Sequence, residues 1–126
     1  MTDKKDEMKM LLDEMLCQAG MILLYCEMSL DRIKRAETAF EMVHHSSFLE
    51  SELLCLMRFP EILQNNNNKY AKETYIKLKE MVDKAEKIRK ESINEINNKK
   101  FLKKMVDLLK PKIQFECAID VEKKNC

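Results

Sequence analysis

The chain has 126 residues, which suits one domain and leaves little room for two, and its net charge is only +1. A single Gly nearly excludes a glycine-rich phosphate loop, and five Cys, an odd number without a C-x-x-C pair, argue against a disulfide framework or a zinc site. With two Pro, no Trp and 36% charged residues, the composition predicts an all-α protein. We expect a compact bundle of about five helices with a long C-terminal helix over residues 1–110, and an irregular tail over residues 111–126.

The first expected helix runs from about Asp3 to Glu27, because apolar residues recur there every three or four positions. These residues are Met8, Leu12, Met15, Ala19, Ile22 and Cys26. Gly20 costs the helix about 1 kcal/mol, so we expect it to permit close approach by a neighbouring helix. We expect neither a secretory signal nor a membrane span, since residues 1–14 are strongly charged and the apolar run at 21–25 is far below the ~20 residues that a span needs.

The next two expected helices are short. Ser29 is a plausible N-cap for the second helix, which should end at His44-His45-Ser46 and carry Ile33, Ala36, Phe40 and Val43 on its inner side. Ser47-Phe-Leu-Glu50 has the form of a capping box, so a third helix should run from Phe48 to about Arg58. Pro60 disfavours helical geometry at Phe59, and we therefore expect the chain to turn at an Arg58-Phe59-Pro60 corner.

The C-terminal half begins after four consecutive Asn residues. A long amphipathic pattern starts near Lys69 and breaks up around Asn97-Asn98, and a last helix should stop before Pro111. Residues 99–112 hold six Lys on an amphipathic pattern; a core helix with a solvated Lys face is favoured over a membrane- or nucleic-acid-binding helix, since the segment has no Arg and one aromatic residue. Residues 113–121 alternate with the period of a strand, and disorder, extended packing on the helices and addition to a partner's sheet edge all stay open.

No residue pattern points to catalysis. The adjacent pair His44-His45 cannot share a metal in the way an i, i+4 pair does, and we predict no catalytic residue, no cofactor and no metal site. Charge is divided unevenly, with 7 basic and 12 acidic residues in 1–68 and 16 basic and 10 acidic residues in 69–126. Solvated helix faces explain this asymmetry more simply than a nucleic-acid surface does.

Several short patterns together resemble a known module. They are Leu30-Asp31, Glu37 and Glu41, the Arg58-Phe59 corner, and Tyr75-x-Lys77-x-Lys79-x-Met81. Over about residues 8–90 the chain resembles the integrase-binding domain of lens epithelium-derived growth factor and hepatoma-derived growth factor related proteins. That domain is similar in turn to the N-terminal helical domain of elongation factor TFIIS.

The resemblance implies a nuclear protein that binds disordered linear motifs of transcription and chromatin regulators through two interhelical loops, with a cytoplasmic location as the alternative. The matching positions are Phe59 with Arg58 in one loop, and Glu27, Met28 and Ser29 in the other. Met28 falls where the family has an Asp that pairs with ligand amides, so this loop departs from the pattern. The implied partner is a disordered peptide motif; binding of nucleic acid or a membrane is not expected.

Two functions follow from these observations. The leading one is a non-enzymatic protein–protein interaction module, an adaptor that is a monomer with Phe59 exposed. The alternative is a structural helical subunit, because the heptads at 8–26 and 78–92 suit an antiparallel, coiled-coil-like assembly in a larger complex or a homodimer. A subunit of that kind should associate in a concentration-dependent way, whereas the adaptor should not.

Overall fold

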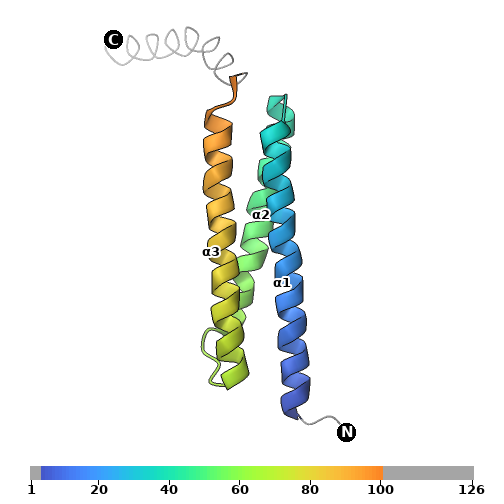
Figure 1. Ribbon diagram of the computed structural model, residues 1–126, viewed down its shortest axis with the longest axis vertical. Helices are drawn as coiled ribbons and strands as arrows, with labels where there is room; N and C mark the ends of the chain where they lie inside the picture. The colour runs from blue at the N-terminus through green and yellow to red at the C-terminus, as the bar shows by residue number, and fades with distance from the viewer. Residues whose placement is uncertain (1–3, 101–126) are drawn as a thin grey trace, which may run out of the picture.

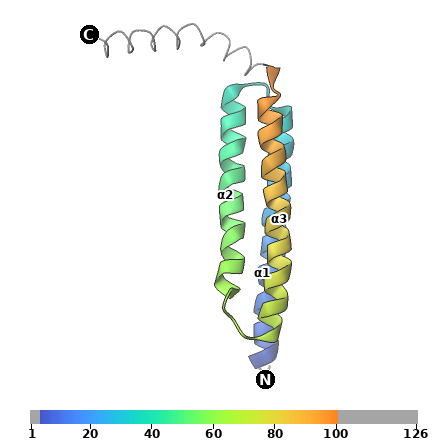
Figure 2. The same ribbon diagram turned by 90° about the vertical axis from the view of Figure 1, so that its left-hand side faces the viewer.

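Three long helices form a bundle in which the chain runs up, down and up again (Figure 1). The computed structural model describes residues 4–100, with α1 at Lys4–Arg35, α2 at Ala39–Leu63 and α3 at Lys69–Asn97. Each helix packs against the other two, and α2 lies beside α3 when the bundle is viewed from its side (Figure 2). The all-α class is therefore confirmed.

The expected number and proportions of the helices are wrong. Residues 4–100 form three helices and not about five, and α1, at 32 residues, is longer than the 29-residue α3. The predictions made for the last helix, the strand-like tail and most of the Lys-rich segment fall on 101–126, outside the described residues.

A seven-residue repeat builds the core on all three helices. Buried residues recur at this spacing in each helix: Leu12, Ala19, Cys26 and Ile33 in α1; Met42, Leu49, Leu56 and Leu63 in α2; and Ala71, Leu78, Ala85 and Ser92 in α3. Such a repeat keeps one seam of every helix facing its neighbours, as in a coiled coil. The heptads that suggested an intermolecular assembly thus pack within a single chain.

The first junction lies later than expected, because α1 continues through Ser29 to Arg35. Ser29 is buried inside the helix, and Leu30 and Ile33 extend the buried stripe without a change of phase. Core packing therefore outweighs the capping preference of Ser at this position. The chain breaks instead before Thr38, which has extended backbone angles (φ −126°, ψ 153°) and whose hydroxyl accepts a hydrogen bond from the Glu41 amide at 3.1 Å.

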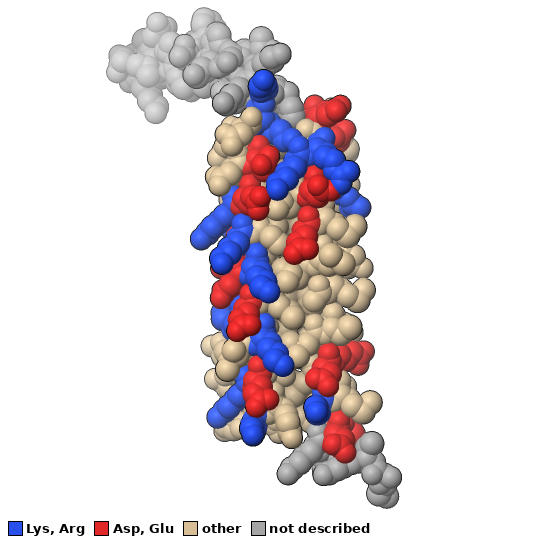
Figure 3. Space-filling model, in the orientation of Figure 1, with Lys and Arg blue, Asp and Glu red and all other residues tan. Residues whose placement is uncertain are grey.

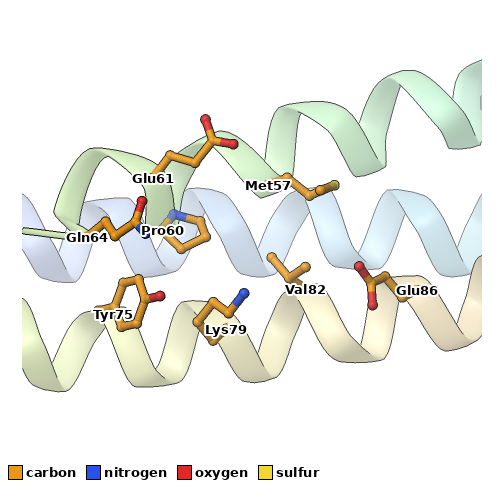
Figure 4. Close-up of a pocket in the computed structure, with 8 residues that line it drawn as sticks. All are labelled: Met57, Pro60, Glu61, Gln64, Tyr75, Lys79, Val82 and Glu86. Atoms are coloured by element: carbon orange, nitrogen blue, oxygen red, sulfur yellow. The ribbon is translucent and has the colours of Figure 1, made fainter.

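The second junction and the expected corner are absent, since α2 is continuous through both. Ser47 lies inside α2 and its hydroxyl donates to the Val43 carbonyl at 2.8 Å, so Ser47 and Glu50 do not form a capping box. Pro60 also lies within α2, with its ring buried and pointing toward α3 (Figure 4). A proline inside a helix removes a backbone hydrogen bond. Burial of the ring offsets that cost, and the helix runs on to Leu63.

The connection from α2 to α3 matches the sequence pattern. Asn68 caps α3, with its side-chain oxygen accepting from the Tyr70 and Ala71 amides at 2.9 and 3.3 Å, and α3 starts at Lys69 as predicted. Gly20 does not mark a close helix approach, because a Cβ built on it would meet no heavy atom within 4 Å.

Candidate interaction surface

The predicted binding residues do not lie on loops. Arg58 and Phe59 belong to α2, and Glu27, Met28 and Ser29 belong to α1. Phe59 is half-buried and packs against the core, whereas Arg58 is exposed.

The two predicted groups are not brought together either. Ser29 contacts Glu52. Phe59 lies seven residues after Glu52 in α2, so the two residues are roughly 10 Å apart along the helix axis at 1.5 Å per residue. The two loops that the family resemblance requires are thus helical here, and no single site combines them.

A different surface stands out, on the side of α2 that faces away from α1 and α3. We call it the outer face of α2. Its members are all exposed: Phe40, Val43, His44, Ser47, Phe48, Ser51, Leu54, Cys55, Arg58 and Ile62. Phe40 and Ile62, near the two ends of the helix, expose 79% and 67% of their surface. Arg58 is the only charged residue among the ten, and the exposed Glu61 lies about five turns after Val43 and so projects on the same side of the helix. Apart from these two charges, this face is apolar or uncharged along the helix.

An aromatic group occupies the first half of this face. The His44 ring stacks on Phe40 with a centroid separation of 5.9 Å and meets Phe48 edge-on at 4.8 Å. These rings, with Val43, Ser47 and Ser51, line a shallow open groove. Contacts of this kind give the exposed aromatic side chains defined positions before any partner arrives.

The middle of α1 adds a second uncharged area. No charged residue occurs between Glu14 and Glu27, and this stretch is the uncharged band between charged ends on α1 in Figure 3. Its exposed members include Met21, Leu24 and Tyr25. Met28, one turn further on, lines a groove with Glu41 and His45 of α2, and the other residues of this groove, Asp31, Arg32 and Arg35, are charged, so the apolar band of α1 ends there.

Polar contacts connect each pair of helices. The Ser29 hydroxyl of α1 donates to the Glu52 carboxylate of α2 at 3.0 Å. Lys34 of α1 pairs with Glu91 of α3 at 2.9 Å, and Arg89 of α3 pairs with Glu50 of α2. The last two pairs are exposed and contribute little to stability one by one.

Two ionisable groups near this α1–α2 contact are perturbed. Burial raises the pKa of the Glu52 carboxyl, and this effect is opposed by the hydrogen bond from Ser29 and the charge of Arg32. Burial, together with the charges of Glu52 and Glu27, raises the pKa of the Cys26 thiol to about 12. A thiol that stays protonated in this way is a poor nucleophile, so Cys26 is a core residue. Cys17, Cys26 and Cys55 are all free thiols.

A partly enclosed hollow lies between the C-terminal turns of α2 and the facing side of α3. It has a volume of about 140 Å³, and Tyr75, Lys79 and Val82 of α3 point into it toward Pro60 (Figure 4). Its charged lining residues are exposed and do not converge on one point. Among residues 4–100, no three His, Cys, Asp or Glu side chains are grouped so that they could hold a metal ion. No helix in this part of the chain is long and apolar enough to cross a membrane.

Comparison with known proteins identifies no relative, since no family model, no curated protein and no solved structure matches this chain. The class that the fold defines is a three-helix bundle with a coiled-coil-like core.

The outer face of α2 escaped sequence reasoning, although a signal for it was present. In α2 only five of 25 residues are charged, against 14 of 29 in α3. The sequence-based prediction divided residues 29–63 into two short helices and a corner, and this division concealed the contrast in charge. It also assigned Phe40 and Val43 to an inner side, whereas both are exposed.

Proposed function

We propose that this protein is a non-enzymatic assembly subunit, a three-helix bundle that binds a helix of another polypeptide chain along the outer face of α2. One observation carries the proposal: α2 is apolar on the side that faces the core and also on the side that faces away from it. A helix that is hydrophobic all round is characteristic of a buried position. Within the described residues 4–100, only one side of α2 is covered.

Isolated exposed apolar residues are normal on protein surfaces and need no explanation. The outer face of α2 differs because its apolar members are contiguous and only two charged residues, Arg58 and Glu61, lie on that side. The same molecule offers the contrast, since α3 carries alternating Lys and Glu side chains over its exposed side (Figure 3). An apolar helix face of this length suits recognition of another amphipathic helix.

The adaptor interpretation has lost its geometric basis, since neither predicted loop exists in the described residues. Binding of a disordered motif of a transcription or chromatin regulator, and a nuclear location, stay predictions from the resemblance alone. The structural-subunit alternative gains support from α2 and not from the heptads first cited for it.

Hydroxyl-radical footprinting of the full chain tests the proposal. Side-chain oxidation should be compared between the dilute purified protein and the same protein in a native extract of its cells. We expect Phe40 and Phe48 to be protected in the extract, while Ile76, an exposed apolar residue on α3, is labelled equally in both. Equal labelling of all three residues in both samples would refute the proposal.

A further inference from the structure

The outer face of α2 fits a second copy of itself running in the opposite direction, and we propose that two copies of this protein pair through that face, centred on Ser51. This inference rests on the proposed function and names the partner helix as α2 of another copy.

The sequence of this face is approximately symmetric about Ser51 in the polarity of its residues. Most residues at equal distances on the two sides match in polarity, and the exception is Val43, whose counterpart Phe59 is half-buried. The matched pairs are Phe48 with Leu54, Ser47 with Cys55, His44 with Arg58, and Phe40 with Ile62. In an antiparallel pair centred on Ser51, each residue lies level with its counterpart on the other copy. The large apolar residues Phe40 and Phe48 then lie level with Ile62 and Leu54, and the polar residues lie level with polar ones, as a self-complementary two-fold interface requires.

Small side chains stand at the centre of this arrangement. Ser47, Ser51 and Cys55 recur every four residues, so they lie along one line on the helix. Two such lines let the helix axes come close together, while the large side chains on either side fill the space between the copies. Phe40 and Phe48 are already held in place by their contacts with His44.

The charges near Ser51 do not oppose this pairing. Arg58 and Glu61 are the charged residues on this side of α2. In the antiparallel pair the two Arg58 residues are 14 helix positions apart, roughly 21 Å, which exceeds the ~8–10 Å over which exposed charges interact at physiological salt. The two acidic neighbours of Ser51 are engaged within their own bundle, Glu50 with Arg89 and Glu52 with Ser29.

The exposed area of the face also bears on this pairing. Phe40 and Phe48 expose 79% and 51% of their surface, and Val43, Leu54 and Ile62 expose 61–67%. An aromatic side chain buries about 150–250 Å² when it is wholly covered, so these five partly exposed residues offer roughly 500–700 Å² on each copy. The exposed uncharged residues between them add to this area, toward the ~800 Å² per partner that a stable interface needs.

Crosslinking in the full-length chain tests both the pairing and its direction. The starting variant replaces Cys17, Cys55, Cys117 and Cys126 with Ser and keeps the buried Cys26. Adding Ser51→Cys should then give a covalent dimer on mild oxidation, because the two thiols meet at the centre. The matched control is Lys84→Cys in the same background, an exposed position on α3 that should give no dimer at the same protein concentration.

Two further variants fix the direction. With Cys55 restored alone, the two thiols of an antiparallel pair are eight helix positions apart, roughly 12 Å, which is too far for a disulfide. Adding Ser47→Cys to restored Cys55 should recover crosslinking, since those positions are level. Crosslinking by Cys55 alone at the rate of Ser51→Cys would overturn the antiparallel pairing.

Sedimentation of the unaltered chain over a concentration series supplies the remaining test. We expect a dimer whose dissociation constant rises roughly tenfold or more in Leu54→Glu, because that dimer would bury two unpaired carboxylates. A chain that stays monomeric throughout the series overturns the proposal. Protection of Phe40 and Phe48 in the extract without self-association of the pure protein would refute the second copy and leave the proposed function standing.

Discussion

The hydroxyl of Ser29 and the carboxylate of Glu52 join α1 to α2 at the edge of the core, with the donor buried and the acceptor half-buried. Burial raises the pKa of Glu52, so the folded protein holds this proton more tightly than the unfolded chain does. The resulting stabilisation is fully present below the unfolded pKa of about 4.3 and is lost as pH rises through the folded pKa. In Glu52→Gln the amide oxygen still accepts the Ser29 hydrogen bond. We expect the unfolding free energy of the native chain to fall relative to this variant between acid and neutral pH, as measured by urea denaturation.

Ser29→Ala is the matched control for this effect. It removes the hydrogen bond that opposes the rise in the pKa of Glu52, so the decline with pH should become steeper than in the native chain. Parallel pH profiles for the native chain, Glu52→Gln and Ser29→Ala would contradict the role assigned to burial.

The start of α2 depends on Thr38. Thr38→Ala should lower the unfolding free energy by about 0.5–2 kcal/mol, because the Glu41 amide loses its side-chain acceptor. Ser47→Ala serves as the control and should stay within about 0.5 kcal/mol of the native value, since its hydroxyl bonds only to a helix carbonyl. Equal losses of unfolding free energy in the two variants, measured by thermal or denaturant unfolding, would show that α2 does not start at Thr38.

Gly20 should tolerate a larger residue. Nothing lies within 4 Å of an added Cβ. Gly20→Ala therefore gains helix propensity without a clash, and we expect stabilisation by about 0.5–1 kcal/mol. A loss of stability in the same denaturation experiment would show that another group does occupy this space.

Phe59 and Phe48 should respond in opposite ways to truncation. Phe59 packs against the core while half-exposed, so Phe59→Ala should cost about 1–3 kcal/mol, less than the ~3–5 kcal/mol of a fully buried Phe. Phe48→Ala should leave the stability of the monomer nearly unchanged and weaken association instead. Unfolding measured on dilute protein, beside sedimentation of concentrated protein, separates the two effects.

Thiol labelling should distinguish the core from the surface. Cys17 and Cys55 are exposed in the single chain and should react with a thiol reagent in the dilute native protein, whereas Cys26 should react only after unfolding. Its raised pKa adds to the protection, because little thiolate forms even in mild alkali. Under denaturing, non-reducing conditions we expect all five thiols to titrate. Peptide mapping of the labelled sites would show any exception.

Sequence reasoning worked where local and tertiary preferences agree. The helical class, the start of α3 at Lys69 and its end near Asn97 were all predictable, because Asn caps flank an uninterrupted amphipathic pattern. Ser29 misled because it has the chemistry of a cap but the position of a core residue. Thr38 and Glu41 also fit the capping-box spacing that was assigned to Ser47 and Glu50, and local sequence alone does not choose between the two.

Pro60 and the outer face of α2 required the tertiary structure. The local preference of Phe59 for extended geometry before a proline is real, but burial of the Pro60 ring in the core outweighs it. With the corner removed, residues 39–63 become one helix, and only then do Phe40, Phe48 and Ile62 lie on one side of it. The candidate surface was therefore hidden by an error in helix boundaries and not by a lack of signal.

Because the described chain forms three helices, its first and last residues lie at opposite ends of the bundle, with Lys4 at one end and Lys100 at the other (Figure 1). In an antiparallel pair centred on Ser51, the two Lys100 residues also point to opposite poles, roughly 35 Å apart at 1.5 Å per residue. Whatever follows Lys100 in one copy therefore starts at the opposite end of the dimer from its counterpart. Such a dimer would present the same attachment point at each of its two ends.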